Sequence, residues 1–235
     1  MGMGEPLMRI LVIDTATDAV VTGVATIGDD TDDRVLAERA VSDGRRHAEV
    51  LTTLIAEVLS ESGVGRADLD AIIVGCGPGP FTGLRVGMAT GSAFGDALGV
   101  PVHGVCSLDA VAAEQLRTDP DARSILVVTD ARRREIYWAR YADGARVSGP
   151  EVTAPVDVVE TLRDEPIDIV VGSPSHAPLF GRPVGAPTVP SVAGLVAAGA
   201  DAVRSGAAPE PLVPLYLRRP DAKEPKPRRK AEVLR

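Results

Sequence analysis

The chain has 235 residues, of which 45% are hydrophobic and 3% aromatic, so it can build one large or two small domains around Val, Leu, Ile and Ala. Its net charge is −8, and residues 218–235 hold eight Lys/Arg against three Asp/Glu, which leaves −13 for the remainder. An acidic body holds RNA poorly by counterion release. We therefore do not expect this chain alone to read RNA. The basic tail is either a solvated end or an RNA contact.

The cysteines and the apolar runs bear on where the protein works. Cys76 and Cys106 each end a Val-containing run that predicts a buried strand, and buried free thiols suit a reducing compartment. Residues 1–9 lack the basic and apolar regions of a secretory leader, and no apolar run approaches the roughly 18 residues of a membrane span. The sequence predicts a cytoplasmic protein without a membrane contact.

The first half of the chain predicts three strands followed by alternating helices and strands. Buried-strand runs and helical apolar stripes, punctuated by Gly and Pro, mark each element. Three meandering strands followed by helical crossovers are the order of a ribonuclease-H-like half. The predicted strands are 8–14, 19–27, 34–41, 71–76 and 101–106, and the predicted helices are 45–62, 82–98 and 107–116.

The second half partly repeats this pattern in a shorter, proline-richer form. Two related halves predict an α/β protein of the actin-like (ASKHA) architecture, with two ribonuclease-H-like halves of which the second is reduced. The predicted strands are 124–130, 135–142 and 167–172, and the helices are 155–163 and 191–204. We expect a disordered N-terminus (1–7), an N-terminal ribonuclease-H-like domain with partner-binding helices (8–106), a smaller C-terminal α/β domain (107–218) and a basic disordered tail (219–235).

Glycine recurs every four residues in the second predicted helix. Gly87, Gly91 and Gly95 form one bare ridge. Each interior glycine costs roughly 1 kcal/mol relative to alanine, so close approach of another backbone should offset the cost. The ridge is covered either by the second domain of the same chain or by a partner protein.

The first predicted helix favours the partner. It carries a core-facing stripe and a second apolar stripe about 90° away, which suggests a second neighbour. We therefore predict a four-helix contact between the first two helices and two helices of a partner. The predicted interface residues are His47, Val50, Leu54, Val58, Gly87, Gly91 and Gly95.

The loop between the fourth strand and the second helix is rich in glycine. Such strand-to-helix loops bind anions through free backbone N–H groups. Here Pro78 and Pro80 remove two donors, and the spacing is not that of a P-loop. The loop 77–83 is either a tight structural turn or a residual nucleotide contact.

Several motifs resemble the TsaB (YeaZ) family. The most specific is GPGPFTGLRVGMATGSAFGDALGVPVHGV (77–105), preceded by ILVIDTAT (10–17). The motifs RRHAEVL (45–51), DARRREIY (130–137) and PLYLRRP (214–220) follow in the expected order. The resemblance spans essentially the whole chain outside the two termini.

The resemblance implies a non-catalytic paralogue of TsaD, the enzyme that transfers threonylcarbamoyl from its adenylate to the tRNA adenosine 3′ of the anticodon. It implies a heterodimer with TsaD through the first two helices, with the ATPase TsaE as a further partner and tRNA reached only through the complex. A homodimer on the same surface is expected where TsaD is absent. ATP or ADP and a metal are expected on TsaD, and no cofactor on this chain alone.

Departures from the active relatives favour the non-catalytic interpretation. The positions of the metal-binding His-x-x-x-His pair of TsaD-type sequences appear here as Ser107 and Val111, so we predict no metal site. Asp14 and Asp130 end the leading strands of the two halves, where actin-like ATPases hold Mg-associated carboxylates. They are either weak relics of a nucleotide site or loop caps.

A chain with its own active site is the alternative, as an actin-like-fold ATPase or a metallopeptidase. A hydrolase nucleophile should have a nearby His-acid context or a G-x-S-x-G elbow, and the sequence shows neither around its candidate serines. Those candidates are Ser107, Ser173 and Ser191. We therefore predict no catalytic residue.

Overall fold

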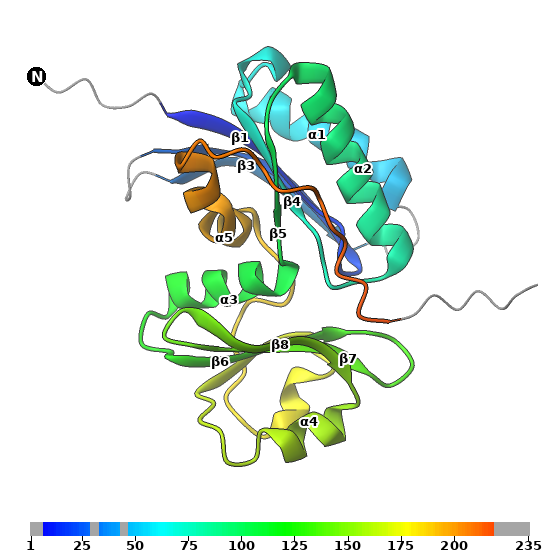
Figure 1. Ribbon diagram of the computed structural model, residues 1–235, viewed down its shortest axis with the longest axis vertical. Coiled ribbons are helices and arrows are strands. Elements are labelled where there is room, and N and C mark those ends of the chain that lie inside the picture. The colour runs from blue at the N-terminus through cyan, green and yellow to red at the C-terminus, as the bar shows by residue number, and fades with distance from the viewer. Residues whose placement is uncertain (1–6, 29–32, 43–46, 219–235) are drawn as a thin grey trace, which may run out of the picture.

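The computed structural model describes residues 7–28, 33–42 and 47–218, and it contains two β-sheets, one above the other in Figure 1. The first sheet has the order β3-β2-β1-β4-β5. Its strands are β1 (Met8–Asp14), β2 (Ala19–Ile27), β3 (Arg34–Ser42), β4 (Ala71–Gly75) and β5 (Val102–Val105). The second sheet has the order β8-β7-β6-β9. Its strands are β6 (Ser124–Asp130), β7 (Ile136–Ala142), β8 (Ala145–Thr153) and β9 (Ile169–Gly172).

Helices cover both faces of each sheet. They are α1 (His47–Ser62), α2 (Phe81–Leu98), α3 (Ser107–Thr118), α4 (Pro155–Thr161) and α5 (Val192–Arg204), with two short 3-10 helices, η1 (Arg66–Asp68) and η2 (Ala177–Phe180). The predicted helices and strands are confirmed, with ends that differ by at most about two residues. No helix in the described part of the chain is long and apolar enough to cross a bilayer.

The strand β8 was not predicted. Gly149 and Pro150 interrupt its apolar pattern, and both favour a turn in a sequence. The strand forms because it lies at the edge of the second sheet, where a residue without an N–H group breaks no inner row of hydrogen bonds.

The two halves share one pairing pattern. β1 pairs antiparallel with β2 and parallel with β4, and β6 pairs antiparallel with β7 and parallel with β9. The second sheet has one strand fewer than the first, which confirms two related halves with a reduced second half.

Side chains that alternate along β1 pack against helices on both faces of the first sheet. Leu11 and Ile13 of β1 lie in an apolar cluster with α1, whereas Ile10 and Val12 lie in a cluster with α5. Successive side chains on a strand point to opposite faces, and a sheet covered on both faces needs apolar residues at almost every position. The four-residue run 10–13 therefore reads as continuously hydrophobic.

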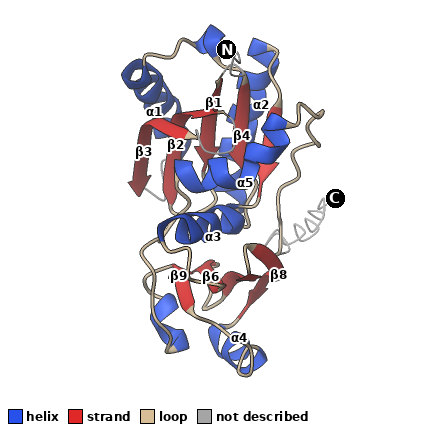
Figure 2. Cartoon of the chain, turned by 90° about the vertical axis from the view of Figure 1, so that its left-hand side faces the viewer, coloured by secondary structure: helices blue, strands red, loops and turns tan. Residues whose placement is uncertain are grey.

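α5 packs on the first sheet, although the sequence placed it in a C-terminal domain of residues 107–218. Val192, Leu195 and Val196 join the cluster of β1 and β2, and Figure 2 shows α5 beside the first sheet, with α3 between the two sheets. The predicted boundary was wrong for this helix because an amphipathic pattern does not identify the sheet that it covers. The predicted disordered segments 1–7 and 219–235 lie outside the described residues, apart from Leu7.

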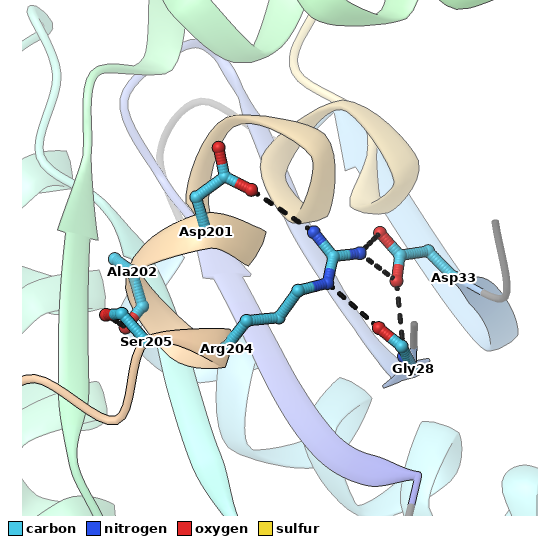
Figure 3. A network of polar contacts seen from close by, with 6 residues as sticks. All are labelled: Gly28, Asp33, Asp201, Ala202, Arg204 and Ser205. Atoms are coloured by element: carbon cyan, nitrogen blue, oxygen red, sulfur yellow. Dashed lines mark hydrogen bonds and ion pairs between the residues drawn. The ribbon is translucent and has the colours of Figure 1, made fainter. Parts of the chain in front are cut away.

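An arginine fastens the end of α5 to the β2–β3 connection (Figure 3). The Arg204 guanidinium donates to both carboxylate oxygens of Asp33, at 2.6 and 2.7 Å, and to the Gly28 carbonyl at 2.9 Å. Bidentate arginine–carboxylate pairs are among the stronger polar contacts in proteins. This contact holds the returning helix against the first sheet.

The last described segment, residues 207–218, ties the two halves together, and we call it the strap. Leu212 packs against the first sheet's α1 side, and the Leu215 N–H donates to the Cys76 carbonyl at 2.9 Å. Leu217 packs against the second sheet, where Arg218 donates to the Ala131 carbonyl at 2.9 Å. The strap thus contacts both sheets within a few residues.

Candidate functional site: the paired helices and the cleft

Thr15, which directly follows β1, forms hydrogen bonds with two backbone groups of α2. The Thr15 hydroxyl donates to the Gly83 carbonyl at 2.7 Å and accepts from the Gly87 N–H at 3.1 Å. In a regular helix these two backbone groups would bond to each other. The contact requires glycines because a Cβ at either position would overlap a Thr15 oxygen.

The rest of the glycine ridge also faces the chain's own sheet. A Cβ at Gly91 would overlap Val74 of β4, and one at Gly95 would overlap Val102 of β5. The prediction that Gly87, Gly91 and Gly95 await a partner was therefore wrong. The physical reasoning that the ridge allows close approach was right, but the neighbour is the N-terminal sheet.

The second apolar stripe of α1 is largely buried in the same way. Leu54 is 8% exposed and Val58 is 0% exposed, and half-buried Val50 packs against the same cluster. Leu54 and Val58 therefore form core contacts within this chain, and the prediction of these two as open interface residues was wrong. The prediction for Val50 stays a prediction. His47 begins α1, but its side chain lies outside the described part of the structure.

The face of α2 opposite the glycine ridge remains open. Ala89, Ala93 and Ala97 recur every four residues and are all exposed, so they form a second ridge of small side chains. On the neighbouring helix α1, Thr52 and Ala56 are also exposed. We call these five residues the outer face, and Figure 1 shows α1 and α2 side by side.

A cavity of about 330 Å³ lies where the ends of β1, β6 and β9 meet. Asp130 contributes to its lining, but the Asp130 carboxylate accepts from the Arg132 N–H at 2.7 Å and pairs with the Arg132 guanidinium at 3.1 Å. Thr129 also lines the cavity, but its hydroxyl is buried and has no hydrogen-bond partner among the described residues. The full lining is Ala16, Thr17, Asp18, Ser42, Pro80, Thr129, Asp130, Arg132, Ser173, Pro174, Ser175, Thr188 and Val189.

Asp14 is fully buried at the root of this cleft and is not part of the cavity lining. Its carboxylate accepts from the Ser107 hydroxyl at 2.5 Å and from the Ala16 N–H at 2.8 Å. Burial raises the pKa of Asp14 from 3.8 to about 6, although both hydrogen bonds lower it. The structure thus places Asp14 in an internal contact between β1 and the start of α3.

The loop 77–83 packs onto the chain rather than standing open. The Gly77 N–H donates to the Ser107 hydroxyl at 3.2 Å, and the Gly77 carbonyl accepts from the Ser107 N–H at 2.7 Å. A Cβ at Gly79 would overlap the Ala16 carbonyl. These contacts favour the tight structural turn over a phosphate cradle.

The remaining candidates for chemistry are scattered. Ser173 has a histidine beside it: its hydroxyl lies 2.9 Å from the His176 Nδ1. Ser175 lies 3.0 Å from the same nitrogen, so the histidine bridges two serines of one loop. His103 is buried in β5, and burial lowers its pKa.

The positions that correspond to the TsaD-type histidine pair, Ser107 and Val111, are both buried. Among the residues that the structure describes, no three His, Cys, Asp or Glu side chains gather as a metal site. Ser191 caps α5 by accepting from the Gly194 N–H at 3.0 Å. That contact gives Ser191 a structural role at the start of the helix.

The sequence interpretation missed Thr15, which explains the glycines of α2. The available signal was its position directly after a buried strand and next to Asp14. A threonine at a strand end predicts a cap or turn, and nothing local in the sequence reveals that its hydroxyl reaches residue 87.

Two α/β halves with the same strand pairing and helices on both faces define the actin-like class of folds. A family model described as TsaD, tRNA N6-adenosine threonylcarbamoyltransferase, matches residues 34–169, which is more than half of the chain. The structure of YeaZ from Pseudomonas aeruginosa has a TM-score of 0.71 and 26% identity, and the match covers 89% of this chain and 100% of that chain.

Sequence relatives agree with this class. An uncharacterized protein of Mycobacterium tuberculosis is 53% identical over 92% of this chain and 95% of its own length, and one of Mycobacterium leprae is 54% identical over 91% and 56%. The tRNA threonylcarbamoyladenosine biosynthesis protein TsaB of Escherichia coli is 40% identical over 57% of this chain and 55% of its own length. The chain thus spans about half the length of the last two. The chain belongs to the TsaB (YeaZ) family, within the wider TsaD-type group.

Replacing Gly91 by Ala should destabilise the protein by about 1–3 kcal/mol, because the added methyl group overpacks the contact with Val74. The higher helix propensity of alanine alone would stabilise the protein by roughly 1 kcal/mol. The sign of the change in the free energy of unfolding therefore shows which effect is larger. Urea unfolding of the variant measures it, with Thr90→Ala on a less buried side of α2 as the control. A more stable Gly91→Ala variant would contradict the packing of this ridge on the sheet.

Replacing Asp14 by Asn should flatten the dependence of stability on pH. The folded-state pKa of Asp14, about 6, lies above the ordinary 3.8. The folded state therefore keeps this proton to higher pH than the unfolded state. The contribution of the protonated Asp14 to the free energy of unfolding is present below about pH 4 and is lost as the pH rises from about 4 to 6. The loss is about 3 kcal/mol.

Unfolding free energies of the wild type, Asp14→Asn and the exposed control Asp18→Asn between pH 4 and 7 test this. An Asp14→Asn variant that keeps the wild-type slope would show that Asp14 does not titrate as its burial requires.

Proposed function

We propose that this chain is a non-catalytic scaffold subunit in the synthesis of threonylcarbamoyladenosine on tRNA, and that it activates a TsaD-type transferase by forming a heterodimer with it. The observation that carries the proposal is the outer face. The glycine ridge of α2 packs on the chain's own sheet, and the alanine ridge on the opposite side of the same helix is exposed. The TsaB name of the E. coli relative supports the pathway.

The outer face suits a partner helix for a steric reason. Alanines spaced by four residues let a second helix approach closely without losing much side-chain entropy. Exposed Arg85 and Asp96 flank the alanines on the same helix, and charges at the rim of an interface favour one partner and register over others. A partner with two such helices would complete a four-helix contact with α1 and α2.

The internal use of the acidic side chains supports an accessory role. Asp14 is buried against Ser107, and Asp130 is paired with Arg132, so each carboxylate already has a partner within the chain. We propose that ATP or ADP and the metal bind to the TsaD partner. TsaE as a further partner, tRNA reached through the complex, a homodimer on the outer face and a cytoplasmic location belong to the same proposal.

Ala93→Glu should weaken capture of a TsaD-type partner at least tenfold and reduce threonylcarbamoyl transfer in parallel. A carboxylate in the centre of a helix contact loses its hydration without gaining a partner. Because Ala93 is exposed in this chain, the fold should tolerate the substitution. Ala202→Glu, at an exposed position of α5, is the matched control.

Size-exclusion chromatography with the partner and a transfer assay measure both effects. A folded Ala93→Glu variant that still binds and activates the partner would place the interface elsewhere. The alternative of a self-contained ATPase, which the position of Asp130 in the lining of the cavity favours, predicts ATP hydrolysis by the purified chain that is lost in Asp130→Ala. That result would refute the accessory role.

A further inference from the structure

The outer side of α2 carries two charged residues of opposite sign. Arg85 and Asp96 are both exposed, and they are the only charged residues of this helix. They are 11 residues apart, so their side chains leave the helix in directions that differ by about 20° and at points about 16 Å apart along its axis. The two charges therefore lie on one face, with the small residues Ala89, Ser92 and Ala93 between them.

Asp96 has no partner within the described chain. Its carboxylate forms no hydrogen bond or ion pair with any residue that the structure describes, and it lies in the last turn of α2. A negative charge at the C-terminus of a helix opposes the helix dipole and lowers the stability of the helix. The stability of α2 therefore gives no reason for an acid here, whereas a cation from outside the chain would compensate its cost.

Arg85 is held in a fixed position but keeps part of its guanidinium unpaired. Its Nε–H donates to the Tyr216 hydroxyl at 3.0 Å, and the guanidinium carbon lies 4.0 Å from the centroid of the Phe81 ring. The rings of Phe81 and Tyr216 stack with centroids 5.1 Å apart. The terminal nitrogens of Arg85 pair with no carboxylate among the described residues. An arginine that is already fixed loses little entropy when it binds a carboxylate.

The arrangement of these two charges is complementary to itself. A two-fold axis brings the same patch of two copies together, so that each contact occurs twice. If two α2 helices pair antiparallel about an axis midway between residues 85 and 96, each Arg85 lies at the level of Asp96 of the second copy. Ala89, Ser92 and Ala93 then lie near the centre of the contact, where small side chains let two helices approach closely.

We propose that a second copy of this chain covers the outer face when no other partner occupies it, in an antiparallel pairing of α2 that joins Arg85 of each copy to Asp96 of the other. The inference rests on the proposed function for the role of the outer face as a protein interface, and it adds the geometry and the two residues that specify self-recognition. The homodimer and the heterodimer then compete for one surface, so self-association limits the number of chains that are free to bind the transferase.

Charge distinguishes a second copy from other occupants of this face. The chain has a net charge of −8, but α2 carries one charge of each sign, so two copies that meet through α2 avoid a direct contact between like charges. A nucleic acid or an acidic peptide would be attracted by Arg85 and repelled by Asp96. A basic peptide would pair with Asp96 and be repelled by Arg85. A second copy provides both charges with a partner.

Analytical ultracentrifugation of the full chain, without the transferase, tests the proposal. Arg85→Asp and Asp96→Arg each place like charges at both ends of the helix pair, so each should raise the dissociation constant of the homodimer at least about tenfold. An equimolar mixture of the two variants should form a heterodimer, because every contact between them again joins an acid to a base. The double variant should dimerise as the wild type does for the same reason. Arg163→Asp and Asp164→Arg, at exposed positions of the second half, are the matched controls and should leave the wild-type equilibrium unchanged.

Three results would overturn the proposal. The first is a wild-type chain that stays monomeric up to about 1 mM, which would leave less than about 4 kcal/mol for self-association. The second is a homodimer of either charge variant that is as tight as that of the wild type, which would place the contact on another surface. The third is a mixture that stays monomeric although circular dichroism shows both variants to be folded, which would exclude the antiparallel pairing.

Self-association is measured without the transferase, and capture of the transferase is a separate measurement. Charge variants that keep the wild-type homodimer, while Ala93→Glu loses capture of the transferase, would refute this inference and leave the proposed function in place. Ala93→Glu that still captures the transferase, while the charge variants lose the homodimer, would refute the proposed interface and leave the self-pairing in place.

Discussion

A single hydroxyl group, that of Thr15, fixes how α2 lies on the first sheet. Thr15 bonds to both the Gly83 carbonyl and the Gly87 N–H of α2, and this contact holds the helix against the end of β1. Glycine is required on the contacting side because no methyl group fits there. With one ridge of α2 fixed against the sheet, the alanine ridge on its other side is necessarily turned outward.

The same residue stretch connects the two halves. Asp14, next to Thr15, bonds to Ser107 at the start of α3, and α3 lies between the two sheets (Figure 2). The strap adds a second connection through Leu215 and Arg218. Two independent connections fix the position of the cleft, whose walls come from both halves. A rigid arrangement of this kind suits a scaffold, whose contribution is to hold surfaces in place.

The order of elements could be predicted because each has a local signal. The runs 10–13 and 125–128 are apolar throughout, and glycines end the helices α1 and α2. The partners of each surface could not be predicted, since the glycine ridge indicates close approach but not the identity of the neighbour. The stacking of Phe81 on Tyr216 could not be predicted either, because the two residues lie far apart in the sequence and meet only through the strap.

α2 contacts its own sheet with one ridge, and we propose that it contacts a partner with the other. Hydrogen exchange of the chain, measured with and without a TsaD-type partner, tests it most directly. We expect complex formation to slow amide exchange over the exposed turns of α1 and α2. The amides of Gly83 to Gly95 that face the sheet should already exchange slowly in the free chain. Slow exchange confined to other elements, with α2 unchanged on binding, would contradict it.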